Sequence, residues 1–356
     1  MAFKIKAVQT DTYGIMDGPE ALSAVSHLTD TKIQVVLPLL DQLPFRINSH
    51  LLKLIQDPKD PIALQVIPRM EELDTSLGEL DPLKEEAYSP VSNLTHRYPD
   101  RVLFLVSDQC AAYCRFCNRR RKVGRPNMVT EETIREGLRY IKANPKIREV
   151  LLSGGDPFML SDQKLEEILS SLRAMSHVEV IRIGTRVPSY LPQRITTNLA
   201  AMLKRFHPLF INIHFNHPKE LTSEAQMALH ILADAGIPLG SQTVLLKGIN
   251  DSAEILKELF LKLLKCRVRP YYLFQADMVA GTRHFWTHPL KGLQLIKELY
   301  GTISGLAIPH FAIDLPQGGG KIILAPQYIK EITLKGIDFE NFEGRLIELP
   351  KHWEDI

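Results

Sequence analysis

The sequence predicts an α/β protein built on a partial (βα)6 parallel barrel, with an N-terminal helical extension and a short C-terminal segment. Six short apolar runs between residues 102 and 275 alternate with windows in which apolar residues recur at helical spacing. The runs are apolar almost throughout, which is typical of parallel strands covered by helices. Chemically distinctive residues follow several of the runs. This favours a barrel, because barrels carry their active sites at the carboxyl ends of their strands.

The expected elements divide the chain into three segments. Residues 1–95 are predicted to be helical and irregular, residues 96–285 to form the barrel, and residues 286–356 to form the C-terminal segment. The predicted strands are 102–107, 149–154, 178–184, 209–215, 237–246 and 268–275. Helical windows such as EETIREGLRYIKAN, DQKLEEILSSLRAM and AEILKELFLKLLK separate them. This alternation predicts that each helix crosses back over a parallel sheet.

Composition excludes several classes of protein. The 356 residues carry a formal net charge of +2 and no long basic run, so we expect no nucleic-acid partner. No run of about 18 apolar residues occurs, so no membrane-spanning helix is expected. The N-terminus, MAFKIKAVQTDTYGIMDGPE, lacks the apolar stretch of a signal peptide. We therefore expect a cytoplasmic protein.

Three of the four cysteines lie within eight residues, in DQCAAYCRFCNRRR after the first predicted strand. The spacing C-x3-C-x2-C places Cys110, Cys114 and Cys117 on one short segment. Three thiolates can hold three irons of a 4Fe–4S cluster and leave the fourth iron open. The alternatives are three buried thiols on one helix face, or a zinc site with a distant fourth ligand. The polar flanking residues and the position after a strand favour the cluster.

Polar residues also follow later strands. The second strand ends in SGGDP, where Gly154 and Gly155 permit close backbone approach and Asp156 can meet an ammonium group. Alone, this pattern fits a simple strand-to-helix turn equally well. His214 after the fourth strand and Gln242 on the fifth are, taken alone, ordinary hydrogen-bonded core residues.

A glycine run precedes a lysine in DLPQGGGK, residues 314–321. This segment lacks the hydroxyl residue and the spacing of a phosphate-binding P-loop. Lys321 is a candidate for imine formation with pyridoxal phosphate. The residues alone do not decide between a phosphate-binding loop, an imine-forming lysine and a plain exposed loop.

The stretch HRYPDRVLFLVSDQCAAYCRFCNRRR resembles the lysine 2,3-aminomutase family of the radical S-adenosylmethionine superfamily. The resemblance extends from about residue 60 to residue 346 and includes the DxPxGGGK element. It implies a 4Fe–4S cluster whose open iron binds S-adenosylmethionine, and reductive cleavage that yields a 5′-deoxyadenosyl radical. It also implies that pyridoxal 5′-phosphate is bound through Lys321.

The resemblance carries site residues over one position at a time. The positions expected near S-adenosylmethionine are Ser153, Gly154, Gly155, Asp156, His214 and Gln242. The positions expected around pyridoxal phosphate are Lys321, Arg97, which matches the phosphate-binding arginine, and the neighbouring Tyr98.

The same resemblance implies an L-lysine substrate that is converted to β-lysine by a 1,2-amino migration. Arg119 matches the position that binds the substrate carboxylate, and Asp277 and Asp314 match the two aspartates that meet the side-chain ammonium. A desolvated ammonium needs such carboxylates. An enzyme for glutamate should not place two carboxylates there, because like charges repel.

Other functions remain as alternatives. The chain could act on another basic amino acid such as arginine, or make β-lysine for modification of elongation factor P. It could also be a metal- or cluster-bearing binding module, although such a module has no need of an imine-forming lysine. An enzyme of this kind needs an electron donor such as flavodoxin or ferredoxin. No cysteine follows Cys266, so we expect none of the structural zinc found in the tail of larger family members, and any homo-oligomer to be built differently.

Overall fold

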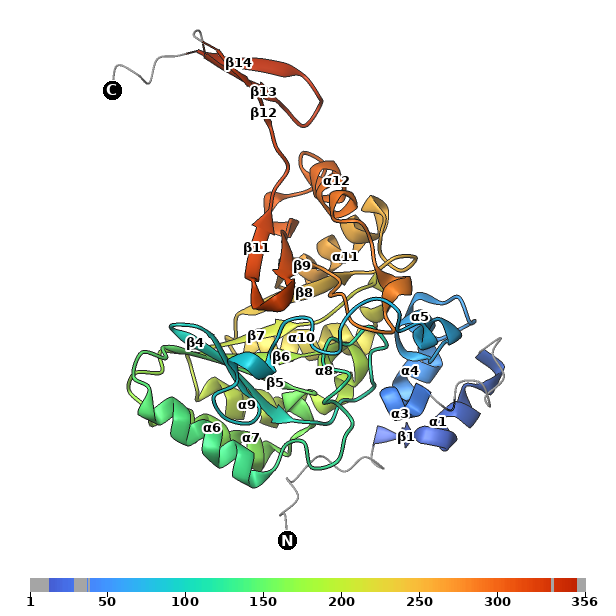
Figure 1. Cartoon of the computed structure of the whole chain (residues 1–356), viewed down its shortest axis with the longest axis vertical. Coiled ribbons are helices and arrows are strands. Elements are labelled where there is room, and N and C mark those ends of the chain that lie inside the picture. Colours follow the sequence, from blue (N-terminus) through green and yellow to red (C-terminus); the bar gives the residue numbers. More distant parts are fainter. Residues whose placement is uncertain (1–12, 29–36, 38, 334–335, 351–356) are drawn as a thin grey trace.

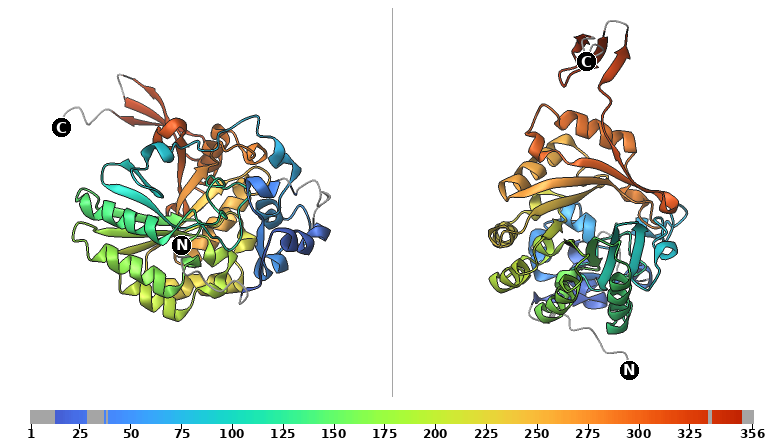
Figure 2. Two further views of the ribbon diagram at one scale, coloured as in Figure 1. Left: turned by 60° about the horizontal axis from the view of Figure 1, so that its bottom comes forward. Right: turned by 90° about the vertical axis from the view of Figure 1, so that its left-hand side faces the viewer.

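A nine-stranded sheet forms the body of the computed structural model, which describes residues 13–28, 37, 39–333 and 336–350 (Figure 1). The strand order is β11-β10-β9-β8-β7-β6-β5-β4-β3. Neighbouring strands from β4 to β10 pair in parallel, whereas β3 and β11 pair antiparallel at the two edges. The sheet curves into a nearly closed barrel with helices on its outside (Figure 2).

All six predicted strands occur, which confirms the predicted fold class. They are β4 (Arg101–Ser107), β5 (Glu149–Gly154), β6 (Val180–Thr185), β7 (Leu209–Ile213), β8 (Leu239–Leu245) and β9 (Val268–Gln275). The sheet gains three further strands, β3 (Leu94–Tyr98), β10 (His310–Leu315) and β11 (Gly320–Leu324). Only β10 is parallel to its barrel neighbour. The sequence analysis missed them because LTHRY and GKIIL do not form long apolar runs and the glycine segment reads as a loop.

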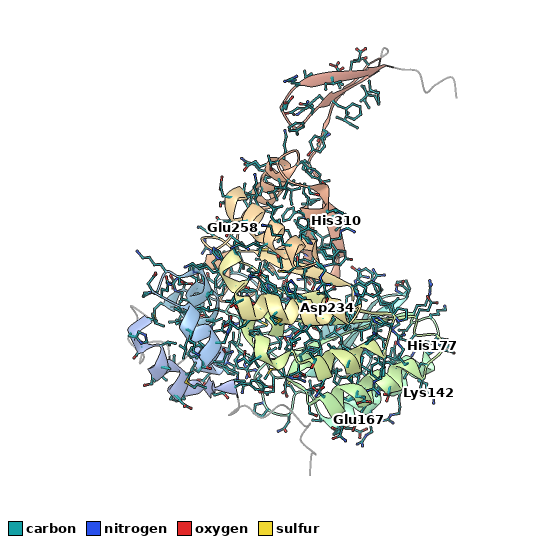
Figure 3. The ribbon with its side chains drawn as sticks, turned by 180° about the vertical axis from the view of Figure 1, so that it is seen from behind. Lys142, Glu167, His177, Asp234, Glu258 and His310 are labelled. Carbon is teal, nitrogen blue, oxygen red and sulfur yellow. The ribbon has the colours of Figure 1, made fainter. Side chains whose placement is uncertain are left out.

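Helices connect the parallel strands and cover their outer face. They are α6 (Glu131–Ala143), α7 (Asp162–Arg173), α8 (Val187–Tyr190), α9 (Thr197–Lys204), α10 (Ser223–Asp234) and α11 (Ala253–Lys265). Hydroxyl side chains cap five of them by accepting a hydrogen bond from the backbone N–H three residues on: Thr130, Ser161, Thr196, Thr222 and Ser252. The exposed side chains of Lys142, Glu167, Asp234 and Glu258 extend outward from these helices (Figure 3).

The barrel strands have two unlike faces. On β5, Val150 and Leu152 are fully buried in the main hydrophobic core, whereas the alternating residues Glu149, Leu151 and Ser153 line an internal pocket. Successive side chains of a strand point to opposite sides, so one strand can serve both the core and a binding site. The barrel interior is therefore a site lined by many polar residues.

The N-terminal segment packs against one side of the barrel. It contains β1 (Ile15–Asp17), α1 (Gly18–Ala24), α3 (Leu39–Gln42), β2 (Arg46–Asn48), α4 (Ser49–Leu54) and α5 (Pro61–Val66). Leu22, Phe45 and Ile62 are buried in the same core as the barrel residues. Residues 1–12, 29–36 and 38 of the predicted helical segment lie outside the described residues.

The C-terminal segment begins with α12 (Pro289–Leu299) and supplies β10 and β11 to the main sheet. A separate three-stranded sheet follows, made of β12 (Ile329–Ile332), β13 (Gly336–Glu340) and β14 (Leu346–Pro350). It projects away from the barrel in Figure 1. Because β3 crosses residue 95 and β10 lies beyond residue 285, the main sheet draws on all three predicted segments, whose boundaries remain a prediction. Among the described residues, no helix combines the length and apolarity needed to cross a bilayer.

Candidate active site

A pocket of about 800 Å³ lies inside the barrel, lined by residues of strands β3 to β11 and of the loops between them. This volume is at the upper end of the range for small-molecule sites. Every residue predicted for the site lines this pocket: Arg97, Tyr98, Cys110, Cys114, Cys117, Arg119, Ser153, Gly154, Gly155, Asp156, His214, Gln242, Asp277, Asp314 and Lys321. The fold therefore brings together residues that are up to 224 positions apart in the sequence (321 minus 97).

The three clustered cysteines lie in the loop that follows β4, and all three are free thiols. Two N–H groups point at their sulfurs: Arg186 Nη1 is 2.8 Å from Cys114 Sγ, and the Arg119 backbone nitrogen is 3.3 Å from Cys117 Sγ. Burial and the neighbouring Cys114 raise the pKa of Cys117 to about 11. A thiolate there needs a positive partner, so the loop fits an iron–sulfur cluster, which supplies that charge.

The two alternative interpretations of the cysteines fit less well. The segment is a loop with turns and not a helix, so the three thiols do not share a helix face. No group of three or more His, Cys, Asp or Glu side chains in the described part of the chain is arranged to hold one metal ion. A zinc ion needs its ligands around a single centre, whereas a 4Fe–4S cluster distributes its thiolates over separate irons.

The glycines after β5 join that strand to the cysteine loop. A Cβ on Gly154, whose φ is +134°, would lie 2.1 Å from the Ser107 carbonyl oxygen. A Cβ on Gly155 would lie 2.4 Å from the Gln109 carbonyl oxygen. The Gly155 N–H also donates to the Ser107 carbonyl at 2.6 Å. Only glycine permits this approach. The close contact is thus with the protein's own backbone, just before Cys110.

Asp156 is committed to the protein itself. Its carboxylate accepts hydrogen bonds from Thr185 Oγ1 at 2.8 Å and from the Arg186 and Phe158 backbone N–H groups at 2.7 and 3.0 Å. Burial raises its pKa to about 6, against the lowering effect of these donors. This carboxylate ties β5 to the end of β6. Ser153, Gly154 and Gly155, just before Asp156, line the pocket as well.

His214 is a neutral ring on the pocket wall. Burial, together with the nearby Arg186 guanidinium, lowers its pKa well below the ordinary value. Its Nε2 lies 2.9 Å from Asn216 Oδ1, and its ring meets Phe116 edge to face. Gln242 lines the same pocket from β8. His214 thus contacts the cysteine loop through Phe116, and Gln242 shares the pocket with that loop.

The hairpin of β10 and β11 presents Lys321 beside Asp314. The two residues are cross-strand partners, and Lys321 Nζ lies 2.9 Å from Asp314 Oδ2. The amine also lies 3.9 Å from the ring centre of Phe274. Burial lowers the pKa of Lys321, although Asp314 acts in the opposite direction. Gly318, at φ +72° in the connecting turn, could not carry a Cβ, because it would lie 2.3 Å from the Tyr88 ring.

Arg97 and Tyr98 on β3 hold the glycine turn from the other side. Arg97 Nε donates to the Gly318 carbonyl at 2.6 Å, and the Lys321 N–H donates to the Tyr98 hydroxyl at 2.9 Å. The guanidinium of Arg97 and the amine of Lys321 thus flank the same turn. A cation and an imine-forming amine are the groups that an anionic cofactor such as pyridoxal phosphate needs.

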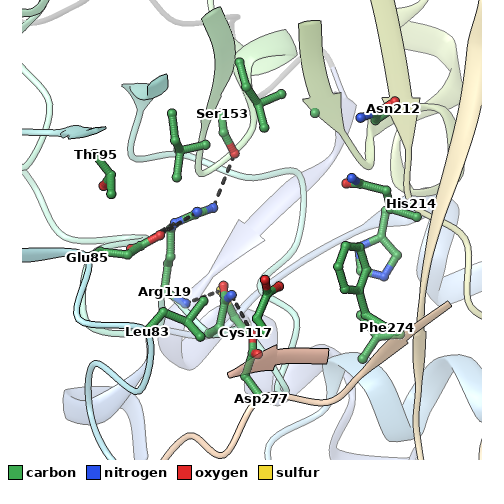
Figure 4. Close-up of a pocket in the computed structure, with 18 of the residues that line it drawn as sticks. Leu83, Glu85, Thr95, Cys117, Arg119, Ser153, Asn212, His214, Phe274 and Asp277 are labelled. Carbon is green, nitrogen blue, oxygen red and sulfur yellow. Dashed lines mark hydrogen bonds and ion pairs between the residues drawn. The ribbon is translucent and has the colours of Figure 1, made fainter. Parts of the chain in front are cut away.

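Arg119 and Asp277 both lie near Cys117 at the end of the cysteine loop (Figure 4). Arg119 pairs with Glu85, with Nη2 2.6 Å from Oε1. Asp277 accepts a hydrogen bond from Asn118 Nδ2 at 2.8 Å. Burial, and the negative charge of Asp314, raise the pKa of Asp277 to about 7. The charged groups that line the pocket thus include the Arg119 guanidinium and the carboxyl groups of Asp277 and Asp314, together with further residues of both signs.

The polar residues of this pocket that the sequence analysis missed include Glu85, Asn118, Arg182 and Arg186. Arg182 lies on β6, and Arg186 comes just after that strand in VIRIGTR. Barrel enzymes carry their active-site residues at the carboxyl ends of the strands, so this rule could have predicted Arg186. Asn118 is next to Cys117 and gave no separate signal. Glu85 lies in a proline- and acid-rich stretch that has no periodic pattern.

Comparison with known proteins identifies the class of this barrel. The profile of the Radical SAM superfamily matches residues 104–259, which run from β4 to α11. The profile named Lysine-2,3-aminomutase matches residues 296–353 in the C-terminal segment. The barrel and its cysteine loop are therefore those of a radical SAM enzyme, with a 4Fe–4S cluster and S-adenosylmethionine as its cofactors.

Curated relatives define the family. The L-lysine 2,3-aminomutase of Fusobacterium nucleatum is 46% identical over 92% of this chain and 78% of its own length. That of Clostridium subterminale is 46% identical over 91% of this chain and 79% of its own length. The glutamate 2,3-aminomutase of Clostridioides difficile is 43% identical over 93% of this chain and 79% of its own length. The chain belongs to the lysine 2,3-aminomutase family, whose members are isomerases.

Proposed function

We propose that this protein is an L-lysine 2,3-aminomutase that converts L-lysine to β-lysine by moving the amino group from C2 to C3. One observation carries the choice of substrate: Asp277 and Asp314 line the same pocket as the three cysteines and Lys321. Two carboxyl groups favour a substrate whose side chain ends in a cation. They disfavour glutamate, the substrate named for one relative of similar identity, because its side-chain carboxylate would be repelled.

The proposed roles follow from the charges in the pocket. Arg119 would bind the substrate carboxylate through a charge-assisted pair of hydrogen bonds. Asp277 and Asp314 would meet the side-chain ammonium at the other end. In the structure, Lys321 Nζ is the cation that lies beside Asp314, at 2.9 Å. This contact supports the proposed role of Asp314, because its carboxylate is already within hydrogen-bond distance of an ammonium group.

The cofactors would be held by residues already described. Cys110, Cys114 and Cys117 would ligate the cluster, and the backbone of residues 153–155 with His214 and Gln242 would contact S-adenosylmethionine. Lys321 would bind pyridoxal phosphate, with Arg97 and Tyr98 near its phosphate. When bound, these groups supply a carbon radical and a conjugated ring that stabilises it. The protein's own part is to hold both ends of the substrate and to exclude water from the pocket.

The cluster also implies a supply of electrons. We propose a one-electron donor such as flavodoxin or ferredoxin, because the cluster must be reduced before it can act. We propose a reducing compartment such as the cytoplasm, because three closely spaced cysteines stay reduced there and can take up a cluster. The expectation of a homo-oligomer stays a prediction.

The test is an anaerobic assay. The reconstituted protein is reduced with dithionite and given S-adenosylmethionine, pyridoxal phosphate and L-lysine, and β-lysine is measured by chiral chromatography. We expect β-lysine from the wild type, none from Lys321→Ala, and no product from L-glutamate or L-arginine. Formation of 5′-deoxyadenosine without β-lysine would contradict the substrate assignment and leave the radical SAM assignment intact.

A further inference from the structure

Glu85 holds Arg119 by one edge of its guanidinium group. Its Oε1 accepts hydrogen bonds from Arg119 Nε at 2.9 Å and from Nη2 at 2.6 Å. The remaining nitrogen, Nη1, points the other way and lies 3.4 Å from Ser153 Oγ on the pocket wall (Figure 4). A guanidinium has two forks of donors, Nε with Nη2 and Nη1 with Nη2. Glu85 occupies the first, and the second remains for a carboxylate in the pocket.

The chain around Glu85 is fixed, so Glu85 can define where Arg119 lies. Residues 79–89 form a strap over the pocket. At one end, the Glu79 N–H donates to the Met278 carbonyl at 3.0 Å, and the Ala280 N–H donates back to Glu79 at 3.1 Å. In the middle, the Pro82 carbonyl accepts from the Gln317 N–H at 3.0 Å. The strap is therefore attached both to the loop that carries Asp277 and to the turn before Lys321.

Charge keeps Glu85 bound to Arg119. The Glu85 side chain is only 7% exposed, and burial alone would raise its pKa. Arg119, Arg121 and Lys122 outweigh burial and lower the pKa of Glu85 to about 2. The carboxylate is thus ionised at any working pH, and the buried Arg119 has a permanent counter-charge. A buried arginine without one would be costly.

We propose that Glu85 is a positioning residue for substrate recognition: it holds Arg119 so that the free fork of the guanidinium faces the α-carboxylate of the amino acid. This inference rests on the proposed function, because it takes Arg119 as the carboxylate site. Without Glu85, the long arginine side chain would lose its fixed orientation, and orientation is what makes bidentate recognition of a carboxylate strong. By orienting Arg119, Glu85 would therefore determine the preference of the pocket for an amino acid over a diamine of the same length.

The experiment compares two probes that differ only in the carboxylate. L-lysine and 1,5-diaminopentane are titrated into the pyridoxal-phosphate-loaded protein without reductant, and binding is followed by the coenzyme absorbance. For Glu85→Gln we expect lysine affinity to fall roughly 10-fold, the worth of one charge-assisted hydrogen bond. Diamine affinity should change less than about twofold, since it makes no contact with Arg119. The lysine-to-diamine ratio is the quantity that a general structural defect would not alter.

Two further variants complete the test. Glu86→Gln is the matched control, because Glu86 carries the same charge on the same strap but pairs with Arg121 and Lys122 at a largely exposed position; its ratio should equal that of the wild type. Glu85→Asp keeps the charge with a shorter reach, and its lysine affinity should lie between those of the wild type and Glu85→Gln. It also serves as the test variant if Glu85→Gln fails to fold.

Several results would overturn the inference. They are an unchanged lysine-to-diamine ratio in Glu85→Gln, an equal loss of affinity for both probes, and tighter lysine binding. The last would mean that repulsion between two carboxylates outweighs positioning. If the wild type makes β-lysine and the ratio is unaffected, this inference alone fails. If the wild type makes no β-lysine from lysine, the proposed function fails independently.

Discussion

At the residue scale, burial and a neighbouring negative charge act in the same direction on the carboxyl group of Asp277. Asn118 donates one hydrogen bond to it at 2.8 Å, while burial and the neighbouring Asp314 raise its pKa to about 7. Such shifts are common where a group meets a charged ligand. An arriving ammonium would favour the ionised form of Asp277, so substrate binding and deprotonation of this carboxyl are linked.

This linkage predicts a pH dependence of lysine binding. Asp277 is protonated below its pKa and ionised above it, and only the ionised form attracts an ammonium. Lysine affinity should therefore rise as pH increases through about 7, by roughly 10-fold between pH 6 and pH 8 if one carboxyl controls it. Binding titrations across this range check the prediction. In Asp277→Asn that rise should disappear. Superimposable pH curves for the two proteins would show that Asp277 does not hold the ammonium.

At the scale of elements, a short 3-10 helix outside the barrel contacts the cysteine loop. This helix, η3 (Met70–Leu73), carries the fully buried Glu72. Glu72 accepts from Arg115 Nη2 at 2.7 Å and from Arg120 Nη2 at 2.9 Å. Arg115 lies between two of the cysteines in sequence, so one carboxylate outside the barrel neutralises two buried cations of the cluster loop.

Removing that carboxylate charge should destabilise the protein. Removing one partner of a buried ion pair costs about 3–5 kcal/mol, because the other charge is left without a partner. Glu72→Gln should therefore lower the free energy of unfolding by about that amount. Urea denaturation measures it. The variant should also retain less iron after reconstitution, because the cysteine loop loses its support. The exposed neighbour Glu71 provides the control, and Glu71→Gln should leave both quantities unchanged. Equal stability of the two variants would contradict this role.

The stability that Glu72 contributes depends on pH in a definite direction. Burial would raise the pKa of Glu72, but Arg115 and Arg120 outweigh it and lower the pKa. A lowered pKa gives stability that is present above the ordinary glutamate value and is lost as pH falls through the folded value. The deficit of Glu72→Gln should therefore be constant between pH 6 and pH 8 and should shrink only in strong acid.

At the scale of the whole molecule, the pocket depends on parts of the chain far outside the barrel strands. Gln65 in α5 accepts the Arg115 N–H through its backbone carbonyl at 2.8 Å and receives Arg186 Nη2 on its side chain at 2.6 Å. Lys321 and Asp314 come from strands beyond residue 285. The barrel segment alone contains neither the support of the cysteine loop nor the lysine.

A fragment of residues 96–285 should therefore fail as an independent unit. It would lack the first two residues of β3, all of β10 and β11, and Glu72. We expect it to unfold at a lower temperature than the full chain and to retain little iron, measured by circular dichroism and metal analysis. The full chain prepared in parallel is the control. A fragment that unfolds cooperatively and binds a full cluster would show that the barrel is a self-sufficient domain.

Some features of this protein were determined by the sequence itself. The six apolar runs predicted six barrel strands, and C-x3-C-x2-C predicted a loop of three thiols that the structure places directly after β4. Both are properties of neighbouring residues, so local spacing is enough to reveal them. The resemblance to one family then selected Lys321, Arg119, Asp277 and Asp314, and the fold brings all four to one pocket.

Other features were decided only by the tertiary structure. Glu85 and Arg119 are 34 positions apart, and Asp156 and Thr185 are 29 apart. Such contacts form because the sheet curves into a barrel and the strap of residues 79–89 lies over the pocket. No local sequence pattern encodes them. The tertiary structure also shows two close contacts that the sequence analysis did not predict: Gly154 and Gly155 approach backbone carbonyl oxygens, and the Asp156 carboxylate accepts a hydrogen bond from the Arg186 N–H. The chemistry was visible in the sequence, whereas the partner of each charged group depended on how distant segments pack.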